Sequence, residues 1–237
     1  EDVLKEFGLR NTDDILFIAV SRLTAQKGLD LLPAAVPPLL GRGMRLIVLG
    51  TGDAAIEKKL LNFADAHPES VAVRIGYDEK TAHRLRAGAD AVLVPSRFEP
   101  CGLVQMYGLR YGTLPVVRRT GGLADSVIDA GPEARAEKGT GFTFTDPTAS
   151  ALSEAMKRAI DAYRDQAAWT RLQRNAMAQD VGWDSAAEKY AALYEEARLA
   201  FRRPSPFSAG TTLAVPPLNP HGGTHDDAKR ISFGKAV

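Results

Sequence analysis

Two basic side chains lie close together in a loop that follows an apolar run. Residues 21–28 read Ser-Arg-Leu-Thr-Ala-Gln-Lys-Gly and follow the run 15–20. Arg22 and Lys27 are near enough in sequence to reach one diphosphate together. Arginine offers a planar fork to phosphate oxygens, lysine supplies a compact charge, and a following helix start adds N–H donors. Taken alone, such a pair of cations favours a solvated basic loop, and only a second motif favours an anion site.

The second motif places a carboxylate just before a predicted helix. Residues 98–103 read Phe-Glu-Pro-Cys-Gly-Leu. Glu99 could accept hydrogen bonds from sugar hydroxyls and oppose positive charge that develops at an anomeric carbon. The N–H groups of Gly102, Leu103 and Val104, at the start of the helix, could bind phosphate. Glu99 could instead be a helix-start carboxylate that only complements the helix dipole.

Cys101, in the same motif, allows two interpretations. Its thiol could be a nucleophile with a lowered pKa at a helix N-terminus, but no histidine is near it in sequence. We therefore expect Cys101 to form a small, polarisable wall of a sugar pocket. As the only cysteine of the chain it rules out an intrachain disulfide, and it is compatible with a reducing cytoplasm.

Three further loops follow apolar runs. Residues 50–53 read Gly-Thr-Gly-Asp and lack the third glycine of a dinucleotide fingerprint, so we expect a compact turn and no hydride-transfer cofactor. Tyr77 could stack on a nucleobase or only cover the edge of a sheet. Gly121 and Gly122 form a glycine-rich turn that could face the same crevice or only cap a helix.

The elements that must position these loops alternate between strands and helices. Short, β-branched apolar runs typical of buried parallel strands occupy 15–20, 45–50, 71–76, 91–95 and 114–117. Segments with helical spacing separate them. This alternation predicts an α/β fold with a doubly wound, Rossmann-like parallel sheet. Ligands bind such sheets outside the carboxyl ends of the strands, which is where the motifs fall.

The remaining segments are less regular. Three prolines interrupt residues 28–40, so we expect a kinked or two-part helix there. Helical spacing returns in the last part of the domain, which we place at 1–201. Periodicity disappears from Arg202 onward, where prolines are scattered among Ser, Thr and Gly, and we expect a mobile tail over 202–237.

The composition excludes several classes of protein. The 237 residues are enough for one large α/β domain with its own core. With 30 basic and 29 acidic residues, the net charge of +1 gives no global attraction for nucleic acid or an anionic membrane. The apolar runs are far shorter than the roughly 20 residues of a membrane span, and the acidic start does not resemble a signal peptide. We expect a soluble, cytoplasmic protein.

Together, the motifs resemble those of bacterial glycogen synthases and plant starch synthases. The resemblance covers residues 1–200, and its most specific part is Ser-Arg-Phe-Glu-Pro-Cys-Gly-Leu at 96–103. More general sugar transferases usually carry Glu-Gly-Phe-Gly-like residues there. The segments that carry the resemblance are 20–28, 50–53, 94–103, 111–123 and the late Gly-Trp-Asp at 182–184.

The resemblance implies the C-terminal lobe of a GT-B glycosyltransferase, in which two Rossmann-like lobes face a cleft. It implies that Arg22 and Lys27 bind the diphosphate of ADP-glucose, that Glu99 holds glucose hydroxyls, and that Tyr77 lies near adenine. The reaction would transfer glucose, with retention, to the non-reducing end of an α-1,4-glucan. ADP-glucose, or ADP, and the glucan are the implied partners, with no metal or other cofactor, no nucleic acid and no membrane.

The resemblance also assigns backbone donors to Gly102 and Leu103, and it has departures. Val104 stands where a threonine is common, which removes a hydroxyl near the phosphates. The family's Lys-x-Gly-Gly-Leu motif and its histidine beside glucose belong to the N-terminal lobe, and nothing in this sequence corresponds to them. We therefore expect nucleotide binding without transfer by this chain alone. A GT-B lobe with another donor or acceptor, and a non-catalytic nucleotide-binding module, stay open as alternatives.

Overall fold

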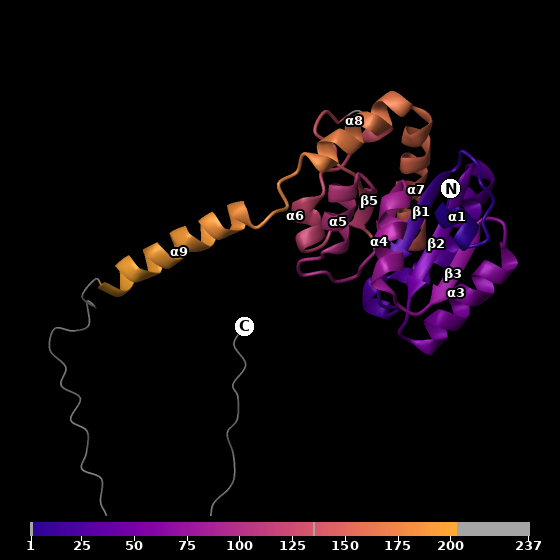
Figure 1. Ribbon diagram of the computed structural model, residues 1–237, viewed down its shortest axis with the longest axis horizontal. Helices are drawn as coiled ribbons and strands as arrows, with labels where there is room; N and C mark the ends of the chain where they lie inside the picture. The colour runs from indigo at the N-terminus through magenta and orange to yellow at the C-terminus, as the bar shows by residue number, and fades with distance from the viewer. Residues whose placement is uncertain (1, 135, 203–237) are drawn as a thin grey trace, which may run out of the picture. The chain divides into compact units, whose positions relative to one another are not determined.

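The computed structural model describes residues 2–134 and 136–202 (Figure 1). Contacts divide the chain into two units, Glu1–Gly182 and Trp183–Val237, and each is described by itself. The first unit is an α/β lobe. The second contains, in its described part, the helix α9 (Asp184–Arg202). The predicted domain 1–201 thus spans the lobe and nearly all of α9, whereas the predicted tail, apart from Arg202, lies outside the described residues.

Six parallel strands form the sheet of the lobe, in the order β3-β2-β1-β4-β5-β6. The five strands predicted from the sequence are all present, to within one residue at each end. The sixth, β6, was not predicted, because three residues are too few to show a periodicity. The strands are β1 (Ile15–Val20), β2 (Met44–Gly50), β3 (Val71–Ile75), β4 (Ala91–Val94), β5 (Leu114–Arg118) and β6 (Phe142–Phe144).

The strand order reverses direction between β1 and β4. These two strands pair directly, with Phe17 opposite Ala91 and Ile18 opposite Val92. The loops that leave their carboxyl ends therefore begin side by side, although they are far apart in the sequence. In doubly wound sheets this reversal is the point at which ligands bind.

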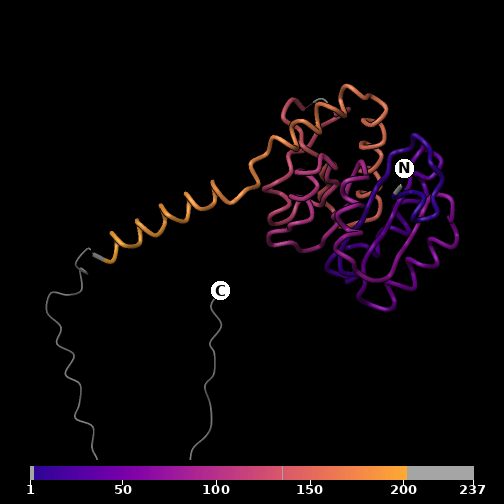
Figure 2. The backbone as a smooth tube through the Cα atoms, in the orientation of Figure 1, coloured from indigo at the N-terminus to yellow at the C-terminus, as the bar shows by residue number. Residues whose placement is uncertain are grey.

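Helices cover both faces of the sheet, and the path of the chain around it can be followed in Figure 2. On one face, α2, α7 and α8 pack in sequence, and α3 packs against α2 and β3. On the other, α1, α4, α5 and α6 pack in a row. The helices of the lobe are α1 (Asp2–Glu6), α2 (Leu32–Ala35), α3 (Ala54–Ala66), α4 (Glu79–Gly88), α5 (Val104–Tyr111), α6 (Gly122–Ser126), α7 (Ala149–Arg164) and α8 (Gln166–Met177).

Two apolar clusters lie on the two faces of the sheet. Alternate residues of β1 divide between them, with Phe17 on the side of α2, α3 and α7 and Ile18 on the side of α1 and α4. All six residues of β1 are buried. Burial on both faces explains why the strands read as continuous apolar runs rather than as alternating ones.

The proline-rich segment 28–40 forms more pieces than the sequence predicts. Short 3₁₀ helices, Leu29–Leu31 and Pro37–Arg42, flank the four-residue α2. Pro33 lies in the first turn of α2, where its missing N–H donor costs no intrahelical hydrogen bond. Two further 3₁₀ helices are Ala25–Lys27 and Pro132–Ala134.

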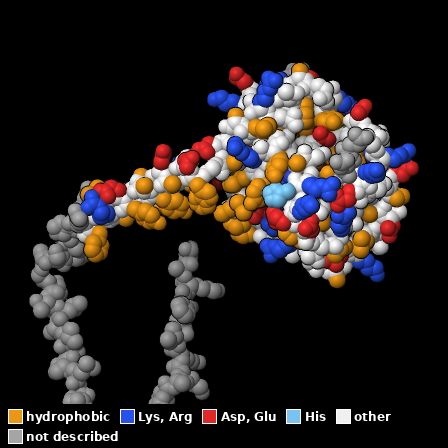
Figure 3. Space-filling model, in the orientation of Figure 1, with side chains coloured by type: hydrophobic (Ala, Val, Ile, Leu, Met, Phe, Trp, Pro, Cys, Tyr) orange, Lys and Arg blue, Asp and Glu red, His pale blue; other side chains and the backbone are white. Residues whose placement is uncertain are grey.

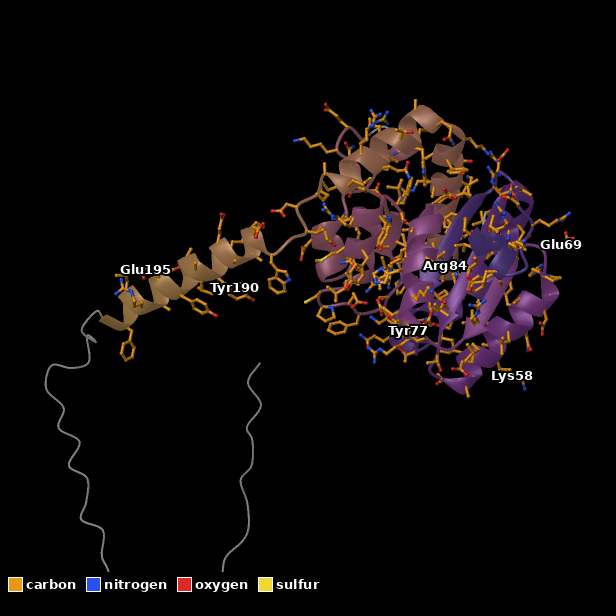
Figure 4. The ribbon with its side chains drawn as sticks, viewed as in Figure 1. Lys58, Glu69, Tyr77, Arg84, Tyr190 and Glu195 are labelled. Carbon is orange, nitrogen blue, oxygen red and sulfur yellow. The ribbon has the colours of Figure 1, made fainter. Side chains whose placement is uncertain are left out.

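Helix α9 exposes large apolar side chains at helical spacing. Trp183, which precedes it, and Tyr190 and Tyr194 within it are all exposed. Figure 3 shows apolar side chains gathered along one edge of this helix, and Figure 4 shows Tyr190 and Glu195 projecting from it. Among the described helices, none is long and apolar enough to cross a membrane.

Candidate functional site

The loop 21–28 is held against the carboxyl end of β4 by a close backbone approach. Gly28 has φ +71°, and a Cβ added to it would lie 2.1 Å from the carbonyl oxygen of Pro95. Any other residue there would force the two loops apart. The glycine thus allows the loop that carries Arg22 and Lys27 to pack on the loop that carries Glu99.

Hydrogen bonds fasten the same two loops together. The backbone N–H of Arg97 donates to the carbonyl of Gln26 (2.8 Å), and the side-chain amide of Gln26 donates to the carbonyl of Phe98 (3.1 Å). The Arg97 guanidinium also binds both carboxylate oxygens of Asp30, at 2.6 and 2.8 Å. This pairing lowers the pKa of Asp30 and raises that of Arg97. Neither residue was predicted from the sequence as part of the site.

Lys27 and Glu99, predicted as separate contacts to phosphate and sugar, form an ion pair with each other. Nζ of Lys27 lies 2.5 Å from Oε2 of Glu99, and the side chains are only 16% and 10% exposed. The same Oε2 accepts a hydrogen bond from the hydroxyl of Ser96 at 3.0 Å. The structure therefore brings these two predicted residues together, with a buried serine that sequence reasoning missed.

Arg22 and Tyr77 line a pocket near this ion pair. A pocket of about 260 Å³ is lined by Ser21, Arg22, Gly50, Thr51 and Tyr77. Pockets that bury a whole drug-sized ligand are roughly 300–1,000 Å³, so this one suits a part of a nucleotide. Within the described chain Arg22 is exposed and forms no ion pair, which leaves its fork available to an anion.

Tyr77 lies at the surface in the loop between β3 and α4 (Figure 4). Its hydroxyl donates a hydrogen bond to Glu79, whose other carboxylate oxygen lies 3.1 Å from Nε2 of His83. The hydrogen bond raises the pKa of Tyr77 and lowers that of Glu79. The ring is thus anchored at its hydroxyl end while it lines the pocket.

The two hollows adjoin at Ser21. This residue lines the pocket of Arg22 and Tyr77, and it also lines a far smaller hollow of about 10 Å³ with Lys27, Glu99 and Val104. The two hollows share Ser21 at the carboxyl ends of β1 and β4, where the strand order reverses. An exposed cation and an aromatic ring line the larger hollow, and a carboxylate lines the smaller one.

The start of α5 offers unpaired donors next to Glu99. The N–H groups of Gly102, Leu103 and Val104 donate no hydrogen bond within the part of the chain that the structure describes. Cys101 and Leu103 are exposed. Beneath them the buried amide of Gln105 donates to the carbonyls of Cys101 (3.1 Å) and Gly102 (3.0 Å), which fixes the turn that enters the helix.

Gly121 and Gly122 lie under the Glu99 loop and, among the described residues, line neither hollow. A Cβ added to Gly121, which has φ +45°, would lie 2.1 Å from the carbonyl oxygen of Glu99. The N–H of Gly122 donates to the carbonyls of Glu99 (3.2 Å) and Pro100 (3.1 Å). These glycines therefore support the loop, and their direct contact with a ligand stays a prediction.

Two donors of the Gly-Thr-Gly turn after β2 bind the side chain of Glu57. Oε1 of Glu57 accepts the hydroxyl of Thr51 and the N–H of Gly52, both at 2.8 Å. Asp53 then caps α3 by accepting from Ala55 and Ile56. Gly50 and Thr51 line the pocket of Arg22 and Tyr77, which agrees with the compact turn predicted from the sequence.

The fold and these loops define a doubly wound α/β lobe, with cations and helix-start donors where the strand order reverses. Comparison with known proteins agrees. The chain belongs to the glycosyl transferases group 1 family, whose model matches residues 1–176.

The similar proteins include glycogen synthases and a starch synthase. A glycogen synthase of Jannaschia sp. is 55% identical over 80% of this chain and 40% of its own length. One of Cereibacter sphaeroides is 56% identical over 76% of this chain and 38% of its own length. Among solved structures, the catalytic domain of starch synthase IV from Arabidopsis thaliana, bound to ADP and acarbose, is 32% identical with a TM-score of 0.75, covering 83% of this chain and 41% of that one.

These comparisons confirm the resemblance to glycogen and starch synthases and the Rossmann-like fold predicted from the sequence. The chain spans about two fifths of the length of the curated relatives it matches.

Proposed function

We propose that this chain is the donor-binding, C-terminal lobe of a retaining GT-B glycosyltransferase of the glycogen synthase type. The complete enzyme would transfer glucose from ADP-glucose to the non-reducing end of an α-1,4-glucan in the cytoplasm. The lobe would bind the nucleotide sugar, and the acceptor groove would belong to a second lobe. The observation that carries the proposal is the pair of adjoining hollows, which places Arg22 and Tyr77 beside the Lys27–Glu99 pair.

Each residue has a role that its surroundings support. The exposed Arg22 would bind the diphosphate with its planar fork, and Lys27 would supply a point charge from the neighbouring wall. The unpaired N–H groups of Gly102, Leu103 and Val104 would add donors to the phosphates. The nucleobase would pack on Tyr77, whose hydroxyl is tied down by Glu79.

Glu99 would serve the sugar. Its carboxylate could accept hydrogen bonds from glucose hydroxyls and oppose the positive charge that develops at the anomeric carbon in the transition state. The exposed thiol of Cys101 would form part of the wall beside it. We propose that no metal is needed, because Arg22, Lys27 and the start of α5 together supply the positive potential that a diphosphate requires.

Binding and turnover measurements on the 237-residue chain test this proposal. Calorimetry should show that ADP and ADP-glucose bind and that UDP-glucose binds more weakly. A glucan elongation assay should show negligible transfer until a second lobe is supplied. A preference for a uridine nucleotide would assign another donor. Binding of ADP with no activity in a two-lobe enzyme would indicate a non-catalytic module, and robust elongation by the chain alone would contradict the division of labour between lobes.

A further inference from the structure

Ser96 lies at the carboxyl end of β4, fully buried beneath the Glu99 side chain. We propose that Ser96 is a positioning residue, which holds the Glu99 carboxylate in the orientation that presents Oε1 to the sugar of a bound nucleotide sugar. The inference rests on the proposed function of Glu99. It adds a residue whose type and position in the sequence carry no sign of such a role.

The hydrogen bonds that the Glu99 carboxylate accepts within the described part of the chain all go to one of its two oxygens. Oε2 accepts from the Ser96 hydroxyl at 3.0 Å and from Lys27 Nζ at 2.5 Å. Oε1 accepts no hydrogen bond from the described residues. One oxygen is therefore committed to the protein, while the other keeps its acceptor capacity for hydroxyl groups of a ligand.

Lys27 alone is a poor means of fixing this carboxylate. Its ammonium ends a long, flexible side chain and is also the group proposed to bind a phosphate. A bound diphosphate would draw Lys27 away from Glu99 or share it. The serine hydroxyl is carried on a single carbon and stays in place, so it keeps Oε2 bound when the ligand competes for Lys27.

Ser96 is itself held from below by Arg118. The Arg118 guanidinium donates to the carbonyls of Ser96 (Nε, 2.9 Å), Arg97 (2.5 Å) and Thr145 (3.1 Å). It thereby joins the ends of β4 and β6 through the backbone of the loop. A supporting shell of this kind is what keeps a ligand-binding side chain within a narrow range of geometry.

The test measures the affinities of the full chain for ADP and for ADP-glucose, by calorimetry, in Ser96→Ala. Loss of the hydroxyl should leave the Kd for ADP unchanged and weaken ADP-glucose by roughly fivefold, the size expected for one hydrogen bond. The ratio of the two constants isolates the sugar. A purely structural serine would change both constants together or neither.

Two further variants make the result specific. Thr113→Val removes another buried hydroxyl. Thr113 directly precedes β5, and its hydroxyl donates to the carbonyl of Arg86 in α4. Thr113→Val should lower the melting temperature about as much as Ser96→Ala does, but it should leave the ratio of the ADP and ADP-glucose dissociation constants unchanged. In a Glu99→Ala background, Ser96→Ala should no longer change the ratio, because the serine acts through the carboxylate.

The outcomes separate this inference from the proposed function. A wild-type chain that binds neither nucleotide, or a Glu99→Ala variant with the same ratio of the two constants as wild type, would overturn the proposed role of Glu99, and the inference with it. A ratio that Glu99→Ala changes and Ser96→Ala leaves unchanged would overturn the inference alone. An equal effect of Ser96→Ala with and without Glu99 would do the same.

Discussion

Lys27 and Glu99 follow different strands of the sheet, yet Nζ of the lysine lies 2.5 Å from Oε2 of the glutamate. The pairing of β1 with β4 brings them together, and Gly28 allows the approach. Each side chain is mostly buried, so each strongly influences the charge that the other presents to a ligand. The proposed phosphate contact and the proposed sugar contact are therefore coupled.

Replacing Glu99 with glutamine should separate the two functions. The variant keeps the shape of the side chain but releases Lys27 from its ion pair, so ADP should bind at least as tightly as to wild type. The affinity for ADP-glucose relative to that for ADP should fall. The kcat of a two-lobe enzyme should fall strongly, because the charge at the anomeric carbon develops only in the transition state. Titration of both nucleotides and turnover assays check this. Weakened ADP binding with intact turnover would make Glu99 a structural helix-start carboxylate.

Replacing Lys27 with alanine should weaken both nucleotides alike. A largely desolvated, charge-assisted phosphate contact is worth on the order of 1.5–3 kcal/mol, and the diphosphate is common to ADP and ADP-glucose. Lys58→Ala, which removes the same charge from the exposed surface of α3, is the matched control and should bind like wild type. If both lysine variants bound the nucleotides alike, Lys27 would serve only its ion pair with Glu99 and would not contact a phosphate.

The strands and the loops that carry the site could be predicted because they depend on local pattern. Runs such as 15–20 are buried on both faces and therefore read as unbroken apolar segments. Position just after such a run was enough to select Arg22, Glu99 and Tyr77. What the local pattern could not supply was the strand order, which decides that the loops after β1 and β4, rather than any other two, meet.

The residues missed by sequence reasoning act through contacts between distant segments. Arg97 binds Asp30, and Arg118 binds the backbone of the loop above it, with no spacing or motif that marks either pair. Ser96 was noted only as part of the family motif at 96–103, with no role of its own. Gly121 was selected by residue type as part of a possible ligand-binding turn, but its close approach to the backbone of Glu99 is a contact between distant segments that residue type does not reveal.

Chelation should leave nucleotide binding unchanged. The positive charges of Arg22 and Lys27 and the N–H groups at the start of α5 are available to a diphosphate without a bridging cation. Calorimetric titration of ADP with and without EDTA provides the measurement, with added Mg²⁺ as a second arm. A large loss of affinity in EDTA, restored by Mg²⁺, would mean that a metal joins the nucleotide to the lobe.

Asp30→Asn should destabilise the lobe at neutral pH and have less effect in acid. Arg97 lowers the pKa of Asp30 below its ordinary 3.8. The stability from a lowered pKa is present above the unfolded value and is lost as the pH falls through the folded value. Because the pair is partly exposed, the loss at neutral pH should be about 1 kcal/mol. Urea unfolding at neutral and acidic pH measures it, and an equal loss at both would exclude the ion pair as the cause.

Asp90 should give the opposite dependence on pH. It precedes β4, and its carboxylate accepts the N–H of Leu16 at 2.8 Å. Burial raises its pKa above the ordinary 3.8, against the smaller influences of that N–H and of Arg45. The stability from a raised pKa is full below the unfolded value and is lost as the pH rises through the folded value.

Asp90→Asn keeps an oxygen that can accept from Leu16 but carries no charge to desolvate. As the pH rises from about 4 to 7, the free energy of unfolding of wild type should therefore fall relative to that of the variant. At neutral pH the variant should be at least as stable as wild type. Urea unfolding across this range, with Asp30→Asn in parallel, gives the two slopes with opposite sign. A wild type and an Asp90→Asn variant with the same slope would mean that the carboxyl titrates alike in the folded and unfolded chains, and that its burial carries no electrostatic cost.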